Sequence, residues 1–182
     1  MPHVYVAAGS NVDADRNLTL AASELAREFP DIRFSPWYRN HAVGFEGDDF
    51  INGAVAFTTT LSLEELLKKL HAIEKLCGRP RDAAKWAPRS MDLDVLMYDD
   101  VVSAEARLPR PDLLKRAYML GPLADIAPEA MHPTAGLTIG ELWNRFDKAA
   151  HPMERLEGGL PFETTVLTSP RSVPRPPQGS DP

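Results

Sequence analysis

Apolar and β-branched residues gather in short runs that predict four strands. The runs are bounded by glycine, proline, asparagine and aspartate, and they cover residues 3–8, 32–38, 50–59 and 91–98. The last run leads through the turn candidate Asp99-Asp100 into a short hairpin partner expected at about residues 101–108. The first part of the chain therefore predicts a sheet of short strands separated by longer connections.

Apolar residues with helical spacing fill these connections. One helix is predicted to begin at Asp13, to keep its apolar residues on one face, and to stop at Pro30. Ser62 to Glu65 has the sequence of a capping box, so a second helix should begin there and end at Gly78. Two further helical segments are expected, over residues 112–126 and 138–146.

The order strand, helix, strand, strand, helix, strand is that of the ferredoxin-like arrangement, which belongs to the α+β class. We expect an antiparallel sheet with two helices on one face and the later helices on the other, in three layers. Residues 1–160 form one domain in this prediction. Prolines crowd residues 161–182, which predicts a disordered tail, with a proline-rich docking peptide as the alternative.

Composition narrows the class of protein. The chain has 182 residues and a net charge of −6, which disfavours general nucleic-acid binding. Cys77 is the sole cysteine, so no intramolecular disulfide can form and a reducing compartment is expected. There is no secretory signal pattern and no run approaching 18 apolar residues, so we expect a cytoplasmic protein without a membrane segment.

Asp92 and Asp94 are the first candidates for chemistry. Side chains two apart on a strand point to the same face, so the two carboxylates should lie together. The alternative is a pair of surface carboxylates on an edge strand. The surrounding residues 91–97 are otherwise too apolar for an exposed edge, which favours a site for a hard cation such as Mg²⁺.

A basic segment precedes this pair. Residues 75–89 hold five lysines and arginines against Asp82, a local charge of +4 in an acidic protein. The arginines suit bidentate contacts with phosphate oxygens, and Lys85 supplies a point charge. The alternative is a solvated basic loop, but the neighbouring aspartates favour a metal–phosphate site. Trp86 either anchors this loop or stacks on a planar ring, and the sequence leaves both open.

Phe50 and Asn52 share one face of the third predicted strand. An aromatic ring beside an amide suits a flat heterocycle with donor and acceptor edges, although such pairs are more often structural. The roles of Tyr38, Glu74 and Tyr118 cannot be decided from each residue alone. His71 lies within the second predicted helix, where an isolated histidine is more often a solvent-facing or core residue than a ligand. The histidines at 3, 132 and 151 have no metal-binding spacing.

Over residues 3 to about 147 the sequence resembles the 6-hydroxymethyl-7,8-dihydropterin pyrophosphokinase family of folate biosynthesis. The resemblance depends above all on Trp86-Ala87-Pro88-Arg89-Ser90-Met91-Asp92-Leu93-Asp94. Shorter matches keep the family order: Ala8-Gly9-Ser10-Asn11, Trp37-Tyr38-Arg39, Phe50-Ile51-Asn52-Gly53, Ile73-Glu74, Gly78-Arg79, Leu108-Pro109, Tyr118-Met119-Leu120 and Ile126-Ala127-Pro128-Glu129.

The resemblance implies transfer of a pyrophosphoryl group from ATP to the pterin hydroxymethyl group, with release of AMP. It implies that Asp92 and Asp94 hold two Mg²⁺ ions, and that Arg79, Arg89 and Trp86 belong to the catalytic loop. The implied nucleotide or phosphate residues are His71, Glu74, Arg81, Lys85, Arg110 and Arg116. The implied pterin residues are Asn40, His41, Val43, Phe50, Asn52 and Tyr118.

Three departures from the family pattern concern substrate contacts. Asn40-His41 stands where the family usually has Thr-Pro, Arg110 replaces a histidine, and Phe50 replaces a tyrosine. They motivate one alternative, a relative with the same chemistry on a modified pterin. A ferredoxin-like binding module without catalysis is another, which the acidic charge disfavours. We expect small-molecule substrates, no nucleic-acid or membrane partner, and a monomer.

Overall fold

The computed structural model describes residues 1–42, 46–78 and 91–159. Val43 and five residues of the basic segment, Arg79, Arg81, Lys85, Trp86 and Arg89, lie outside these ranges, as does the predicted tail. The described elements are β1 (His3–Ser10), α1 (Ala14–Glu28), β2 (Arg33–Phe34), β3 (Tyr38–Asn40), β4 (Phe50–Thr58), α2 (Leu63–Leu76), β5 (Asp92–Tyr98), the 3-10 helix η1 (Pro111–Leu114), α3 (Ala117–Ile126), α4 (Ile139–Arg145) and β6 (Glu154–Arg155).

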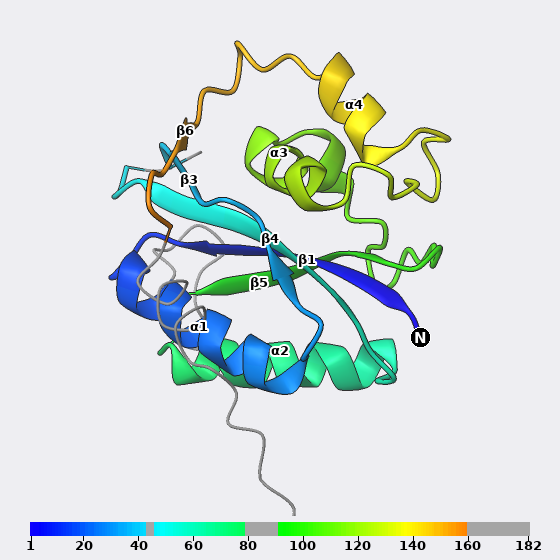
Figure 1. Ribbon diagram of the computed structural model, residues 1–182, viewed down its shortest axis with the longest axis horizontal. Coiled ribbons are helices and arrows are strands. Elements are labelled where there is room, and N and C mark those ends of the chain that lie inside the picture. The colour runs from blue at the N-terminus through cyan, green and yellow to red at the C-terminus, as the bar shows by residue number, and fades with distance from the viewer. Residues whose placement is uncertain (43–45, 79–90, 160–182) are drawn as a thin grey trace, which may run out of the picture.

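One antiparallel sheet forms the middle layer of the molecule, with strand order β5-β1-β4-β3-β6 and β2 paired to β4. Helices α1 and α2 cover one face of this sheet, and α3 and α4 cover the other (Figure 1). The order β1-α1-β2/β3-β4-α2-β5 confirms the predicted ferredoxin-like arrangement and the three layers.

Each face of the sheet has its own apolar core. Beneath α1 and α2, strand residues such as Val6 and Leu93 pack with Leu18, Leu66 and Leu70. On the opposite face, the side chains of Ala7, Ala54 and Leu96 pack with α3 and α4 through Leu120, Leu123 and Ile139. Because both faces are covered, the strands tolerate far more apolar residues than a one-sided sheet would.

The helix predicted to open with a capping box does so. The Ser62 hydroxyl accepts a hydrogen bond from the Glu65 amide, and the Glu65 carboxylate accepts one from the Ser62 amide. Gly78 follows the last turn of α2 with φ of +83°, a left-handed conformation that suits glycine. Asp13 precedes α1 as predicted, but its side chain makes no capping hydrogen bond.

The strand predicted over residues 32–38 is wrong as a single element. It is broken into β2 and β3, which pair with successive parts of β4. Pro36 has no N–H to donate to a ladder. Ser35 next to it still donates its amide to the Ala54 carbonyl at 2.9 Å, and its hydroxyl accepts a hydrogen bond from the Ala54 amide at 2.8 Å. The second piece, β3, also extends two residues past the predicted strand, to Asn40.

The position of β5 corrects a second expectation. The apolar residues 91–97 argued against an edge strand, yet β5 is the outermost strand of the described sheet. Its apolar side chains are buried by helices on both faces instead of by a neighbouring strand. Part of its free backbone edge is also used, because the Glu74 carboxylate accepts from Leu93 N–H and the Leu96 carbonyl accepts from Arg110 N–H.

Three further elements differ from prediction. No strand forms over residues 101–108, where a single bridge joins Ser103 to Leu108 and the segment turns back on itself. The helix expected over residues 112–126 is divided into η1 and α3, because Arg116 adopts an extended conformation between them. The two-residue strand β6 was not predicted, and its polar residues give no apolar alternation. In the described part of the chain, no helix is long and apolar enough to cross a membrane.

Candidate active site

The register of the sheet brings the predicted substrate and metal residues into one row. Gly9 at the end of β1 pairs with Asn52 on β4 and, on its other side, with Asp92 on β5. Neighbouring strands lie about 4.8 Å apart, so the backbones of Asn52 and Asp92 are separated by roughly 10 Å. The next row on the same face is Ala54, Ala7 and Asp94. The two β1 residues in these rows, Gly9 and Ala7, are both small.

Asp92 and Asp94 lie on the same side of β5, as predicted. Both are half-buried and alternate with the buried residues Leu93 and Val95. Asp94 forms an ion pair with Arg110, whose Nη2 lies 2.9 Å from Oδ1, and the two side chains are only 22% and 21% exposed. Burial, followed by the negative charge of Asp92, raises the pKa of Asp94 to about 7 against the opposing effect of Arg110.

These properties fit a cation site. Two carboxylates that face each other in a partly buried position disfavour one another's charge, and a divalent cation would relieve that cost. Among the residues that the structure describes, no group of three acidic, histidine or cysteine side chains suited to a metal occurs. The donor set therefore suits Mg²⁺, which binds through few carboxylates and keeps its other positions for water and phosphate oxygens.

Glu74 and His71, both predicted near the nucleotide, occupy different environments on α2. Glu74 is buried, and its Oε1 accepts a hydrogen bond of 2.8 Å from the backbone amide of Leu93, between the two aspartates. It fixes the backbone that carries the carboxylates. His71 lies on the exposed face of the helix. The structure therefore brings Glu74, but not His71, into contact with β5.

The predicted pterin residues gather on β3 and β4. The Asn52 side chain is buried, and its Nδ2 donates a hydrogen bond of 2.5 Å to Oδ1 of Asn40. The Asn52 Oδ1 lies over Gly9, where a Cβ atom would come within 2.3 Å of it. The amide is thus held from two sides. Phe50, two residues earlier on β4, pairs with Asn40 on β3.

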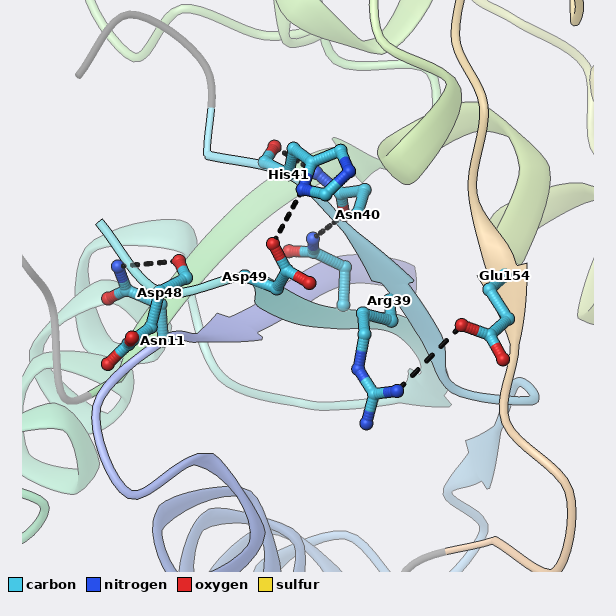
Figure 2. Close-up of polar contacts among 8 residues, drawn as sticks. Asn11, Arg39, Asn40, His41, Asp48, Asp49 and Glu154 are labelled. Carbon is cyan, nitrogen blue, oxygen red and sulfur yellow. Dashed lines mark hydrogen bonds and ion pairs between the residues drawn. The ribbon is translucent and has the colours of Figure 1, made fainter. Parts of the chain in front are cut away.

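The loop after β3 is tied to this cluster by side-chain contacts. Figure 2 shows His41 beside Asp49, with 2.7 Å between Nδ1 and Oδ1. It also shows Asn11, from the turn after β1, where Nδ2 donates to the Asp48 carbonyl at 3.4 Å. Both ends of the described loop are therefore held close to the strands that carry Asn40 and Asn52.

A pocket of about 160 Å³ opens beside these residues. Asn40 and His41 line one side, and Arg116 and Tyr118 at the start of α3 line another. Burial raises the pKa of the Tyr118 phenol, with Arg116 opposing the effect. The remaining wall comes from residues 150–153, near the end of the described chain. The pocket thus joins predicted pterin residues to a predicted phosphate residue.

Comparison with known families identifies the chain. The model of the 7,8-dihydro-6-hydroxymethylpterin-pyrophosphokinase family matches residues 5–128, more than half of the sequence. The chain belongs to this family. The row from Asn52 to Asp92, Arg110 and Tyr118 lies within the matched residues, whereas the wall of the pocket at residues 150–153 follows them.

Curated members of the pterin pyrophosphokinase family give the same result. A 2-amino-4-hydroxy-6-hydroxymethyldihydropteridine pyrophosphokinase from Synechocystis is 44% identical over 65% of this chain, but the match spans only 61% of that relative's length. Enzymes of the same name from Aquifex aeolicus and Pseudomonas aeruginosa are each 38% identical. Those two matches cover 73% and 85% of this chain, and 85% and 94% of the relatives.

Solved structures agree on the fold. A Plasmodium falciparum protein, HPPK-DHPS with pteroate, superposes with a TM-score of 0.59 at 14% identity, over 79% of this chain and 42% of that one. The same protein with SDX-DHP gives a TM-score of 0.57 over 79% and 43%. At this identity the likeness supports the fold alone.

Sequence reasoning missed two features of this pterin pyrophosphokinase site. The ion pair between Arg110 and Asp94 joins residues 16 positions apart, and only the turn after β5 brings them together. The contribution of residues 150–153 to the pocket had no signal in the sequence, because this stretch has neither apolar periodicity nor a motif. The predicted domain, residues 1–160, includes this stretch but assigns it no element and no role.

Proposed function

We propose that this protein transfers the β,γ-pyrophosphoryl group of ATP to the hydroxymethyl group of 6-hydroxymethyl-7,8-dihydropterin, giving the pterin diphosphate and AMP in folate biosynthesis. Membership of the pterin pyrophosphokinase family supports this reaction. The structural observation that carries it is the row Asn52, Gly9 and Asp92, which sets a heterocycle-binding amide two strands away from a carboxylate pair suited to metal-bound phosphates.

In this proposal Asp92 and Asp94 hold two Mg²⁺ ions, and Glu74 keeps their strand in place through Leu93. When bound, the ions would neutralise phosphate charge and align ATP for in-line displacement. Arg116 and the arginines at 79, 81 and 89 would bind phosphate oxygens, with Lys85, Trp86 and His71 on the nucleotide side. Arg110, now paired with Asp94, would be available to a phosphate once a cation takes its place.

On the pterin side, Asn52 would bind the heterocycle through its amide while Phe50 and Tyr118 enclose the ring. Asn40 holds one hydrogen of the Asn52 amide and leaves the other for the substrate. His41 and Val43 would border the ring from the loop. This arrangement does its work by positioning, since bringing two reactants together in the right orientation supplies much of the rate of such transfers.

The reaction is tested by the identity of its product. Purified protein with ATP, Mg²⁺ and 6-hydroxymethyl-7,8-dihydropterin is expected to form AMP and pterin diphosphate in equal amounts, and neither without the pterin. Asp92→Asn should lower kcat by about a hundredfold or more, because one metal ligand is lost. Asp100→Asn, which changes an exposed aspartate in the turn after β5, is the matched control and should keep wild-type turnover. ADP as the only nucleotide product would refute the proposal.

A second candidate is the same transfer to a modified pterin. The observation that favours it is the hydrogen bond from Asn52 to Asn40, a residue that departs from the family's usual threonine. Comparing kcat/KM for pterin alcohols that differ at the ring edge decides between the two candidates. A preference of about tenfold or more for a modified ring would support the second.

We further propose that residues 1–160 form a single domain that acts as a monomer in the cytoplasm on small-molecule substrates, without nucleic-acid or membrane partners. The continuous sheet from β5 to β6 and the two core clusters that share it support a single domain. Size-exclusion chromatography with light scattering tests the oligomeric state, and a mass near 40 kDa, twice the 20.1 kDa of the chain, would contradict it.

A further inference from the structure

Residues 150–156, which we call the C-terminal strap, cross the edge of the sheet beside the predicted pterin residues. Within the strap, β6 pairs with β3 through Glu154 and Arg155, and the amide of Leu156 donates to the Trp37 carbonyl at 2.8 Å. Figure 2 shows Glu154 facing Arg39, with 3.8 Å between the carboxylate and the guanidinium. The strap is therefore attached to the strand whose last residue is Asn40.

The strap is also packed on α3. A Cβ atom at Gly121 would lie 2.6 Å from the terminal methyl of Met153 and 3.0 Å from the ring of Trp143. The absence of a side chain at Gly121 thus lets Met153 and Trp143 pack closely there, and α3 and the strap meet at this residue. Gly121 lies one turn after Tyr118 on the same helix. The strap thus bridges the two elements, β3 and α3, that carry Asn40 and Tyr118.

Between these attachments the strap forms one wall of the 160 Å³ pocket, through residues 150–153. The pocket has room for about five water molecules at liquid density, a volume suited to part of a bicyclic ring with its substituent. Its lining includes Arg116, Tyr118 and His151, and it contains no aspartate or glutamate. Aromatic residues beside an arginine suit a planar ring whose substituent receives a phosphate group.

We propose that the C-terminal strap is part of the substrate site and determines the affinity of this protein for the pterin. The inference rests on the proposed function and deepens it, because it assigns a binding role to a segment beyond the residues that the family model matches. The strap closes the outer side of the pterin position at Tyr118 and Asn40, while the metal and ATP side at Asp92 and Asp94 lies across the sheet from it.

Ala149 and Ala150 offer a matched pair for the test. Both are exposed alanines next to each other in the chain, but only Ala150 lines the pocket. Ala150→Trp fills the pocket without removing a described contact of the side chain, and Ala149→Trp adds the same indole outside it. For Ala150→Trp we expect KM for the pterin to rise about tenfold, with a smaller change in KM for ATP, because Arg116 shares the pocket, and with the unfolding midpoint unchanged. Ala149→Trp should keep all three.

Two results would overturn the inference: a pterin KM for Ala150→Trp within twofold of wild type, or an equal rise in Ala149→Trp. If the wild-type protein forms no AMP, the proposed function fails separately. Pterin binding is then titrated by its fluorescence, with Mg²⁺ and a non-hydrolysable ATP analogue. Binding that is weakened in Ala150→Trp alone supports the strap, and either equal binding by both variants or no binding by the wild type contradicts it.

Discussion

Arg110 is the residue that most distinguishes this site from a simple pair of metal ligands. Its guanidinium occupies one oxygen of Asp94, and its Nε is buried without a hydrogen-bond partner among the described residues. The positively charged side chain of Arg110 is therefore already paired with Asp94, one of the two carboxylates assigned to Mg²⁺. The guanidinium and the metal therefore compete for Asp94, and Arg110 lowers the charge that a metal ion meets on approach.

Removing this competitor should strengthen metal binding. For Arg110→Ala we expect the Kd for Mg²⁺ alone, measured by isothermal titration, to fall about fivefold, the equivalent of about 1 kcal/mol for an ion pair of this kind. Lys115→Ala removes the same charge from an exposed position after η1 and is the control for long-range electrostatics. Unchanged or weaker binding by Arg110→Ala would show that the pair does not oppose the metal.

At the scale of elements, β1 is the strand on which the site is organised. It lies between β4 and β5, so its end separates the Asn52 amide from the Asp92 carboxylate. Gly9 is required there because the Asn52 Oδ1 fills the space that a side chain would need. Ala7 in the next row is also small. The strand thus contributes no chemistry of its own but sets the distance between two binding groups.

A methyl group at Gly9 should therefore disturb the pterin side first. In Gly9→Ala, Cβ would lie 2.3 Å from Asn52 Oδ1, so the amide must turn away from its position. We expect KM for the pterin to rise about tenfold, with a smaller effect on KM for ATP. In an Asn52→Ala background the same substitution should have little further effect. Effects that simply add in the double variant would contradict this account.

The elements that could be predicted were those whose own residues carry a local sequence pattern. Runs of apolar and β-branched residues predicted β1, β4 and β5, and the Ser62 capping box located the start of α2. What failed depended on contacts distant in sequence. The hydrogen bond from the Ala54 amide to the Ser35 hydroxyl, the covering of edge strand β5 by helices, and the pairing of β6 with β3 are all decided by partners that local patterns do not contain.

For the candidate site, sequence alone placed Asp92 and Asp94 on one face, because the period of a strand requires it. It also gave Phe50 and Asn52 a common face. It did not show that Asn52 and Asp92 stand in one row, since that depends on the register of both with Gly9. The Arg110 ion pair and the C-terminal strap likewise arise from tertiary structure.

At the scale of the whole molecule, two apolar cores stabilise the three-layer fold, whereas the charge of Asp94 in the site destabilises it. Two apolar clusters bury the faces of the sheet, while Asp94 is kept near Asp92 in a partly buried position. A carboxyl group whose pKa rises on folding binds a proton more tightly in the folded state. The free energy of unfolding of the metal-free protein should therefore depend on pH, and the addition of Mg²⁺ should raise it.

The sign of this dependence follows from the raised pKa of Asp94, from 3.8 to about 7. Its contribution to stability is complete below the unfolded value and is lost as pH rises through about 7. In urea unfolding with EDTA, the unfolding free energy of Asp94→Asn relative to wild type should be lowest near pH 4, and it should rise by at least about 1 kcal/mol on going to pH 8. Saturating Mg²⁺ should raise the wild type and not the variant. Parallel pH curves would contradict the linkage.

The alternation along β5 has a consequence for how this segment can change in evolution. Leu93 and Val95 face a dry core while Asp92 and Asp94 face the site, so each residue's role depends on its parity along the strand. One inserted or deleted residue would exchange the two sets, sending carboxylates into the core and leucine into the site. A single-residue insertion between Met91 and Val95 that no bulge absorbs would therefore disrupt the core and the site together.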